Sequence, residues 1–160
     1  MAASNPDKTP ISVQELAERV GQEFALSRWF DMPQSRIDAF ADAIEDWQFI
    51  HINPEAAKAT PFGGTIAHGF LTLSMLSAIA YDALPAIDNM AMSVNYGFDK
   101  VRFLTPVPAG ARIRGHFTLL EFKPRKPMEW QMRKGVEVEI EGLPKPALAA
   151  EWLGLVYLKS

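Results

Sequence analysis

One stretch of the chain, from Ile66 to Tyr81, constrains the fold more than any other. Read as a helix, its apolar side chains wrap most of the circumference instead of forming a single stripe, so the helix must be covered on several sides. Polar residues interrupt the stretch, and it falls short of the roughly 20 residues that a membrane span needs. We therefore expect a buried central helix at about residues 66–82. The apolar positions are Ile66, Phe70, Leu71, Leu73, Met75, Leu76 and Ile79.

The part of the chain that follows this stretch has a different pattern. Four segments alternate between apolar and polar residues with the period that is typical of strands, and turns rich in Pro and Gly separate them. A helix that is apolar nearly all round, followed by long strands, predicts an antiparallel sheet wrapped around the helix, which is an α+β fold. The four segments are residues 94–103, 111–122, 128–140 and 148–158.

The part of the chain before the central stretch predicts shorter elements. Ser12 and Glu15 have the spacing of a capping box and predict a short helix after Ser12. Residues 23–30 suit a strand, and apolar residues at helical spacing after Pro33 predict a further helix. Residues 46–52 are expected to be irregular.

Length and composition exclude several classes of protein. A chain of 160 residues is long enough for one well-buried core and short for two, so we expect one domain over residues 1–160, with residues 1–10 as a flexible tail. A net charge of −3 gives no basic field for nucleic acid or for an anionic membrane surface. The chain has no cysteine, and its first residues lack the pattern of a secretory signal, so the expected location is the cytoplasm.

The first candidate for chemistry is the pair Asp46 and His51, five positions apart in the irregular segment. A carboxylate and a neutral imidazole in a partly desolvated site can share proton transfer near neutral pH. Taken alone, this spacing more often reflects an exposed aspartate near a helix start and a loop histidine bonded to the backbone.

The second candidate is the run Phe62 to Phe70, in which glycines lead into the central helix. A helix start has free backbone N–H groups that can stabilise an oxyanion. Gly69 N–H can serve in this way only if the helix begins near Ala67 or His68, because capping by Thr65 would leave that N–H bonded within the helix. Close packing of another element against Gly69 is the alternative.

These two segments resemble a known family. They have the sequence D-x-Q-F-I-H-I-N-P-E-A-A, followed by P-F-G-G-T-I-A-H-G-F-L-T-L-S. This sequence resembles the MaoC-like (R)-specific enoyl-CoA hydratases, and in particular their NodN-type branch. The later V-N-Y-G-F-D-K-V-R-F also resembles that branch, so the likeness covers roughly residues 20–158. The resemblance implies a hot-dog fold, a homodimer, and reversible hydration of trans-2-enoyl-CoA to (R)-3-hydroxyacyl-CoA. It implies no metal and no cofactor, coenzyme A being part of the substrate.

The resemblance also assigns roles to residues. The family's catalytic pair falls on Asp46 and His51, its oxyanion-binding glycine on Gly69, and a supporting serine on Ser77. In the implied reaction, Asp46 and His51 activate one water for attack at C3, and Gly69 N–H polarises the thioester carbonyl. The substrate is a thioester of coenzyme A or of an acyl carrier protein.

The chain departs from the broader family beside the aspartate. There the aspartate follows a glycine and precedes Asn-Pro, whereas here Glu45 precedes it and Gln48-Phe49 stands in place of Asn-Pro. Gln48 can still orient a carboxylate or water through its amide, so we count it as a supporting residue. The loss of a rigid proline puts the substrate range in question more than the chemistry.

Other residues are weaker candidates. His68 belongs to the motif, and we expect it to be structural. Lys123 and Arg125 lie in a basic turn that could contact the phosphates of a nucleotide carrier, although a solvated hairpin tip has the same composition. Arg102 competes with Lys100 for that role.

Two other functions fit the same fold. A hot-dog thioesterase would direct water to the carbonyl instead of C3, and the intact Asp46 and His51 pair counts against it. A non-catalytic acyl-CoA-binding subunit would need neither group.

Overall fold

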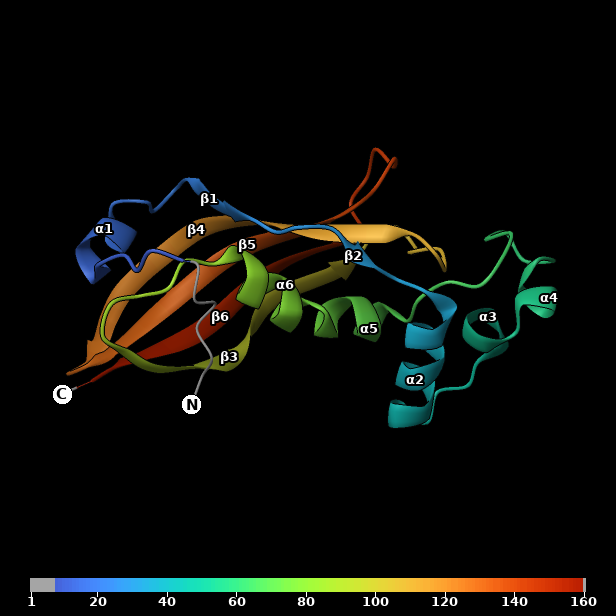
Figure 1. The fold of residues 1–160 in the computed structure, drawn as a ribbon, viewed down its shortest axis with the longest axis horizontal. Helices are drawn as coiled ribbons and strands as arrows, with labels where there is room; N and C mark the ends of the chain where they lie inside the picture. The colour runs from blue at the N-terminus through green and yellow to red at the C-terminus, as the bar shows by residue number, and fades with distance from the viewer. Residues whose placement is uncertain (1–7, 160) are drawn as a thin grey trace.

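The protein is described by a computed structural model, which defines residues 8–159. Its strands form one antiparallel sheet in the order β1-β4-β5-β6-β3, with β2 also paired to β4. Figure 1 shows this sheet curving around two central helices, which confirms the α+β arrangement of a sheet wrapped around a helix. The strands are β1 (Glu23–Leu26), β2 (Phe30–Asp31), β3 (Met90–Phe103), β4 (Arg112–Lys126), β5 (Glu129–Ile140) and β6 (Leu148–Leu158).

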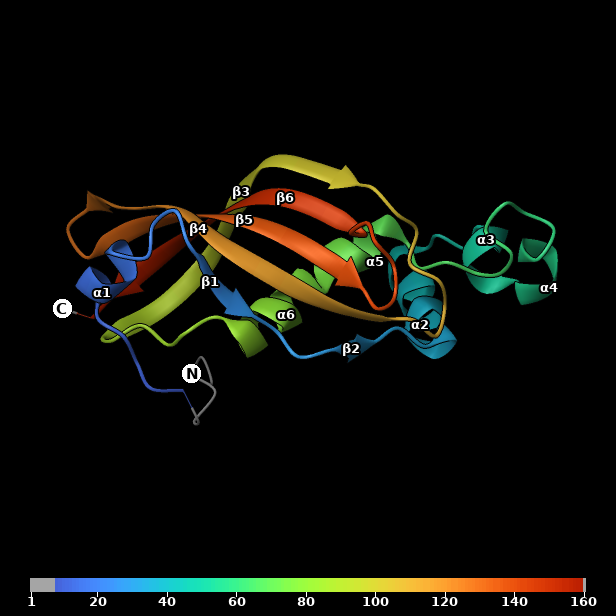
Figure 2. The same cartoon turned by 90° about the horizontal axis from the view of Figure 1, so that it is seen from above.

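The helices lie at three places relative to the sheet. One covers one end of the sheet, two lie against the concave face, and three project beyond the other end (Figures 1 and 2). In that order they are α1 (Val13–Ala17), then α5 (Gly69–Ser74) and α6 (Leu76–Ala83), then α2 (Gln34–Ile44), α3 (Phe49–Ile52) and α4 (Pro54–Ala57). None of the helices within residues 8–159 has the length and apolar character that a membrane crossing requires.

The central helix is present, with bounds that differ from the expected 66–82. It begins at Gly69 and is divided at Met75, whose backbone remains helical (φ −62°, ψ −19°). The helix starts later than expected because the backbone before it forms hydrogen bonds with other segments. Ile66 N–H donates to Ile50 O, and Ala67 N–H donates to Val107 O. These bonds hold the entry to the helix in an extended form.

Packing of this helix on the sheet depends on a glycine. Ile79 is fully buried, and a Cβ at Gly115 of β4 would overlap its side chain. Glycine in a strand is typical of such a close approach. A second, smaller core lies beneath α1, where Leu16 packs with Leu119 and Val156.

The remaining sequence predictions are largely confirmed. All four predicted strands lie within or overlap β3 to β6, and the capping box of Ser12 and Glu15 is present ahead of α1. The single strand predicted over residues 23–30 is divided, since residues 27–29 leave the ladder. Residues 46–52 include the one-turn helix α3. Of the predicted flexible tail, residues 1–7 lie outside the described residues, whereas Lys8 Nζ donates to Leu84 O.

The strand β3 forms one edge of the sheet. It pairs only with β6 among the described strands, and most of its side chains are exposed. Exposed hydrophobic side chains are present along its length and on the neighbouring helices: Met92, Val94, Tyr96, Phe98, Phe103, Phe70 and Tyr81.

Candidate active site

The site begins where α2 ends. The helix stops at Ile44, and Glu45 takes a left-handed conformation (φ 59°, ψ 34°). Asp46 N–H then donates to Ala41 O at 3.1 Å, which ties the next residue back to the last turn of α2. The broader family has glycine before the aspartate, and this chain has Glu45. Position 45 is therefore the one position of this turn where glycine has a conformational advantage.

His51 lies in the single turn of α3 and is 7% exposed. Its Nδ1 is 2.7 Å from Ile66 O, and because a carbonyl can only accept, Nδ1 carries the proton and Nε2 keeps a free lone pair. Burial lowers the pKa of His51, and the neighbouring His68 lowers it further, against the opposing effects of Ile66 O and Asp46. His51 is therefore a neutral base at neutral pH.

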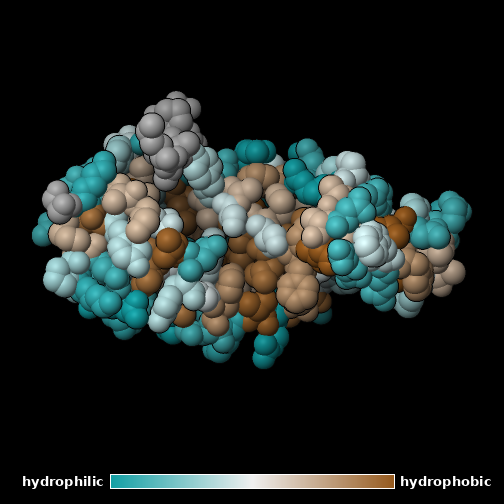
Figure 3. Space-filling view, turned by 90° about the horizontal axis from the view of Figure 1, so that it is seen from below, coloured by the Kyte–Doolittle hydropathy of each residue, from teal (hydrophilic) through white to brown (hydrophobic). Residues whose placement is uncertain are grey.

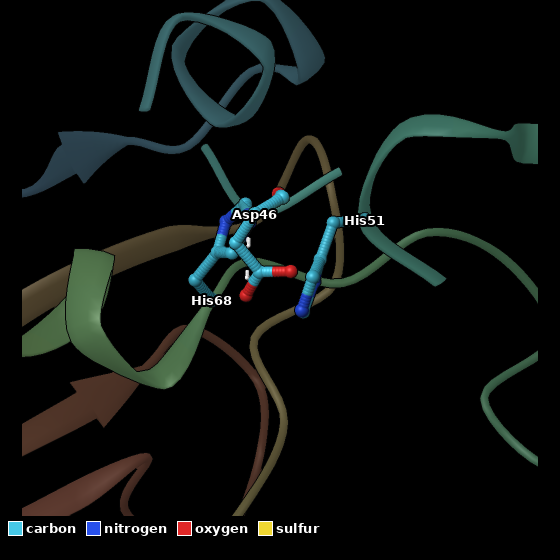
Figure 4. A group of neighbouring side chains, drawn as sticks. All are labelled: Asp46, His51 and His68. Atoms are coloured by element: carbon cyan, nitrogen blue, oxygen red, sulfur yellow. Dashed lines mark hydrogen bonds and ion pairs between the residues drawn. The ribbon is translucent and has the colours of Figure 1, made fainter. Parts of the chain in front are cut away.

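Asp46 faces both histidines. Figure 4 shows its carboxylate directed toward the rings of His51 and His68, and the potential ligand atoms of the three side chains all lie within 4.8 Å of one another. The Asp46 side chain is 47% exposed, so solvent reaches the carboxylate while the imidazoles behind it are buried. A water held here would contact one carboxylate and one neutral imidazole.

His68 is a site residue whose part in this cluster the sequence did not indicate. It is 2% exposed and stacks on His51 with ring centroids 3.8 Å apart. Its Nε2 donates to the main-chain carbonyl of Asp46 at 3.0 Å. The structural role expected for His68 therefore consists of two contacts: it stacks on the ring of His51 and holds the backbone of Asp46.

These three side chains fit a metal ion poorly. A metal lies close to the plane of each imidazole that binds it, at about 2.0–2.1 Å from the nitrogen for zinc. The rings of His51 and His68 are stacked with an interplanar angle of 27°, so their lone pairs lie in nearly parallel planes and do not converge on one point. The geometry favours proton transfer over metal binding.

Gly69 stands at the first position of α5, with His68 as the N-cap residue. Its N–H makes no hydrogen bond within residues 8–159, so the condition for an outward donor is met. Thr65 does not cap the helix; its hydroxyl donates to the amide oxygen of Gln34. A Cβ at Gly69 would lie 3.1 Å from the ring of Phe103, so close packing and an accessible N–H both favour glycine here.

Gln34, the first residue of α2, connects α3 to the segment that precedes α5. Besides accepting from Thr65, it donates from Nε2 to the main-chain carbonyl of His51 at 2.7 Å. Nothing in the sequence indicated Gln34, because its partners are distant in the chain and no local pattern relates them.

The two supporting residues differ in their placement. Gln48 is the N-cap residue of α3, and its backbone N–H donates to the Asp46 carboxylate at 3.3 Å. Its side chain is exposed and contributes no hydrogen bond among the described residues. Ser77 lies on α6 and lines a cavity of about 530 Å³ beside that helix, away from the Asp46 cluster.

The structure does not bring the three basic candidates to the cluster. Arg102 lines a groove of about 710 Å³ that also contains the outward side chains of β4 and β5. Lys123 and Arg125 lie within the last residues of β4 and not in a turn as predicted, because β4 continues to Lys126 and pairs there with β5. This end of β4 is at the opposite end of the sheet from α3 (Figure 2). Lys123 is paired with Glu121 and Arg125 with Glu129. A role for these residues in binding the carrier stays a prediction.

Comparison with known proteins gives consistent results. Residues 15–141 match the model of the MaoC like domain. The chain is 48% identical over 147 residues to nodulation protein N of Rhizobium leguminosarum bv. viciae, covering 91% of each chain. It is 40% identical over 144 residues to 3-hydroxyacyl-thioester dehydratase Z of Mycobacterium tuberculosis, covering 90% of this chain and 95% of the relative.

A solved structure extends this similarity to the fold. The monoamine oxidase regulatory protein from Archaeoglobus fulgidus superimposes with a TM-score of 0.77 at 25% identity, over 94% of this chain and 97% of that chain. The sheet and central helices described above are therefore shared along nearly the full length.

Proposed function

Because the chain belongs to the MaoC-like dehydratase family and has its hot-dog fold, we propose that it is an (R)-specific enoyl-CoA hydratase that also catalyses the reverse dehydration. The observation that carries the proposal is the buried, neutral His51 beside the Asp46 carboxylate, with the free N–H of Gly69 next to His68. The Mycobacterium tuberculosis relative, named as a dehydratase of 3-hydroxyacyl thioesters, supports the class of reaction. We propose no metal or redox cofactor.

In the proposed reaction, Asp46 and His51 transfer the protons and Gly69 stabilises the developing charge. Nε2 of His51 and the Asp46 carboxylate hold one water, and His51 accepts a proton from it as the water oxygen bonds to C3. Electron density moves to the thioester oxygen, where Gly69 N–H stabilises the developing charge. A proton from the Asp46 and His51 pair then reaches C2, so the elements of one water are added across the double bond.

We further propose that the protein is a homodimer with β3 at the interface. An edge strand with exposed hydrophobic side chains is a template for pairing with another chain, and Tyr96 and Phe98 lie in the middle of it. Sedimentation velocity should give twice the chain mass for the wild type. Tyr96→Lys should shift the protein toward the monomer, and a wild-type monomer with full activity contradicts this part of the proposal.

The test of the proposed function is hydration of crotonyl-CoA and of a medium-chain enoyl-CoA, followed as loss of absorbance of the conjugated enoyl group. Asp46→Asn and His51→Ala should each reduce the rate by about 10²–10⁴, the effect of losing acid–base catalysis. Glu45→Gln is the matched control, since the Glu45 side chain is exposed and adjacent to Asp46. Chiral analysis of the product should show the (R) alcohol.

One result would replace this proposal with the binding-subunit alternative. That result is a wild-type protein that binds acyl-CoA but hydrates no chain length. Release of free coenzyme A without hydration would instead indicate the thioesterase.

A further inference from the structure

A cavity lies beside α6, and none of Asp46, His51, His68 and Gly69 lines it. It lies between α6, β3 and the concave face of the sheet, and its walls include Ser77, Tyr81, Val94, Met132 and Trp152. Figure 3 shows the molecule from below, with hydrophobic residues gathered over the middle of this view. Ser77 lies eight residues beyond Gly69, which is about 12 Å along a helix at 1.5 Å per residue. An acyl chain whose thioester lies at Gly69 would point its far end toward this cavity.

A buried lysine lies behind one wall of the cavity, in contact with Trp152, which lines it. Lys134 is on the core-facing side of β5 and is 6% exposed. Its Nζ lies 3.9 Å from the centroid of the Trp152 ring and 3.7 Å from the point where a Cβ of Gly154 would stand. Because residue 154 has no side chain, Lys134 can extend across β6 toward β3, the strand that forms another wall of the cavity.

The ammonium group of Lys134 has no anionic partner here. No hydrogen bond or ion pair from Nζ is formed within residues 8–159, and the indole ring below it offers only a cation–π contact. Burial lowers the pKa of Lys134 to about 8, so the group is still mostly protonated at neutral pH. Buried charges in proteins are normally paired, so an ammonium group with only a cation–π contact is open to an anionic acceptor.

A second donor beside Lys134 also lacks an acceptor. Nε1 of Trp152 is buried and has no hydrogen-bond partner in the described part of the chain. One donor lies over the face of the Trp152 ring and the other at its edge, and the two oxygens of a carboxylate can accept from both. A hydrocarbon chain alone would leave both donors unsatisfied.

We propose that this cavity binds acyl chains whose far end carries a carboxylate, held by Lys134 Nζ and the indole N–H of Trp152. The inference rests on the proposed hydratase function and adds a substrate class to it. Lys134 acts as a specificity-determining residue that touches the distal end of the substrate and takes no part in proton transfer.

The experiment compares three substrates: trans-2-decenedioyl-CoA, its distal methyl ester, and trans-2-decenoyl-CoA. The wild type should prefer the free carboxylate by about 10–100-fold in kcat/KM, the range expected for one charge-assisted hydrogen bond. Lys134→Met, which keeps the length of the side chain and removes its charge, should lower kcat/KM for the dicarboxylate to the value for its methyl ester and so abolish the preference. Lys145→Met, at an exposed lysine in the loop after β5, is the control.

The outcomes separate this inference from the proposed function. If the wild type hydrates all three substrates at equal rates, the inference is wrong and the proposed function still stands. A partner subunit that supplied an anionic acceptor for Lys134 would give this result. If the wild type hydrates none of them, binding of saturated decanedioyl-CoA and decanoyl-CoA, followed by Trp fluorescence, decides the question. Tighter binding of the dicarboxylate that is lost in Lys134→Met supports the inference, and equal binding overturns it. Lys8 and Lys159 also line the cavity, so Lys8→Met and Lys159→Met are measured beside Lys134→Met, and loss of the preference in either of them with its retention in Lys134→Met overturns the inference. If Lys134→Met does not fold, Lys134→Gln takes its place.

Discussion

Replacing Glu45 with glycine should stabilise the protein. Glu45 has φ 59° and ψ 34°, a conformation that costs a residue with a Cβ about 1–2 kcal/mol. Glycine removes this cost but loses about 0.5–1 kcal/mol of backbone entropy on folding. The Glu45 side chain is exposed and makes no hydrogen bond or ion pair in the described residues, so nothing else is lost. The net gain should be about 0.5–1 kcal/mol, or roughly 1–4 °C in Tm for a chain of this size.

Urea unfolding of the wild type, Glu45→Gly and Glu45→Ala measures this gain. Alanine keeps the Cβ and removes the carboxylate, so Glu45→Ala should give no stabilisation if the backbone conformation is the cause. Asn89 has the same φ of 59°, but asparagine tolerates this region, so Asn89→Gly should gain less. Equal stabilisation by Ala and Gly at position 45, or destabilisation by Gly, would refute the conformational argument. Hydration activity should be unchanged, since Asp46 N–H remains bonded to Ala41 O.

Four further predictions concern the site. Because burial lowers the pKa of His51, hydration should persist at pH values below the ordinary histidine range near 6.5. For the same reason the free energy of unfolding should fall as pH decreases from about 6.5 toward the pKa of His51 in the folded protein, because in this pH range only the unfolded chain binds the proton. His51→Gln should flatten this pH dependence, measured by urea titrations. Gly69→Ala places a methyl group 3.1 Å from the half-exposed ring of Phe103. Because the substrate would be displaced, kcat/KM should fall by about 10–100-fold while Tm changes little. Unchanged kinetics would contradict the role of Gly69. His68→Phe keeps the stacked ring but removes the charge that helps to lower the pKa of His51, so the acidic limb of the pH–rate profile should move to higher pH; an unmoved limb would show that His68 acts through packing alone.

Much of the fold followed from local pattern. The alternation of β4 and β5 and the apolar circumference of the central helix are each visible within a dozen residues, so their type was predictable. The boundaries were less so, because they depend on distant partners. The helix starts at Gly69 because Ala67 N–H bonds to Val107 O, and β1 ends where the Ser27 hydroxyl accepts a bond from Gly115 N–H.

The candidate site was predictable only where it lies in one continuous motif. Asp46, His51 and Gly69 follow from the resemblance, and the structure places all three at the same end of the molecule. Gln34 had no local signal, because its role depends on contacts across the fold. Lys134 is in the register of the apolar residues Met132 and Val136, so the alternation alone places it on the core face, but its contact with Trp152 is visible only in the structure.

The pairing of β3 with β6 has a consequence for how the chain folds. The strands β4, β5 and β6 follow one another and can pair as soon as they are synthesised, whereas β3 precedes them and must wait for the last strand: Met90 pairs with Leu158, and Phe103 with Leu148. Contacts of such large sequence separation form slowly. During translation, β3 therefore remains unpaired until β6 has left the ribosome, with its hydrophobic side chains available to other nascent chains. We expect the length of this interval, more than the stability of the finished sheet, to limit the yield of folded protein in the cell.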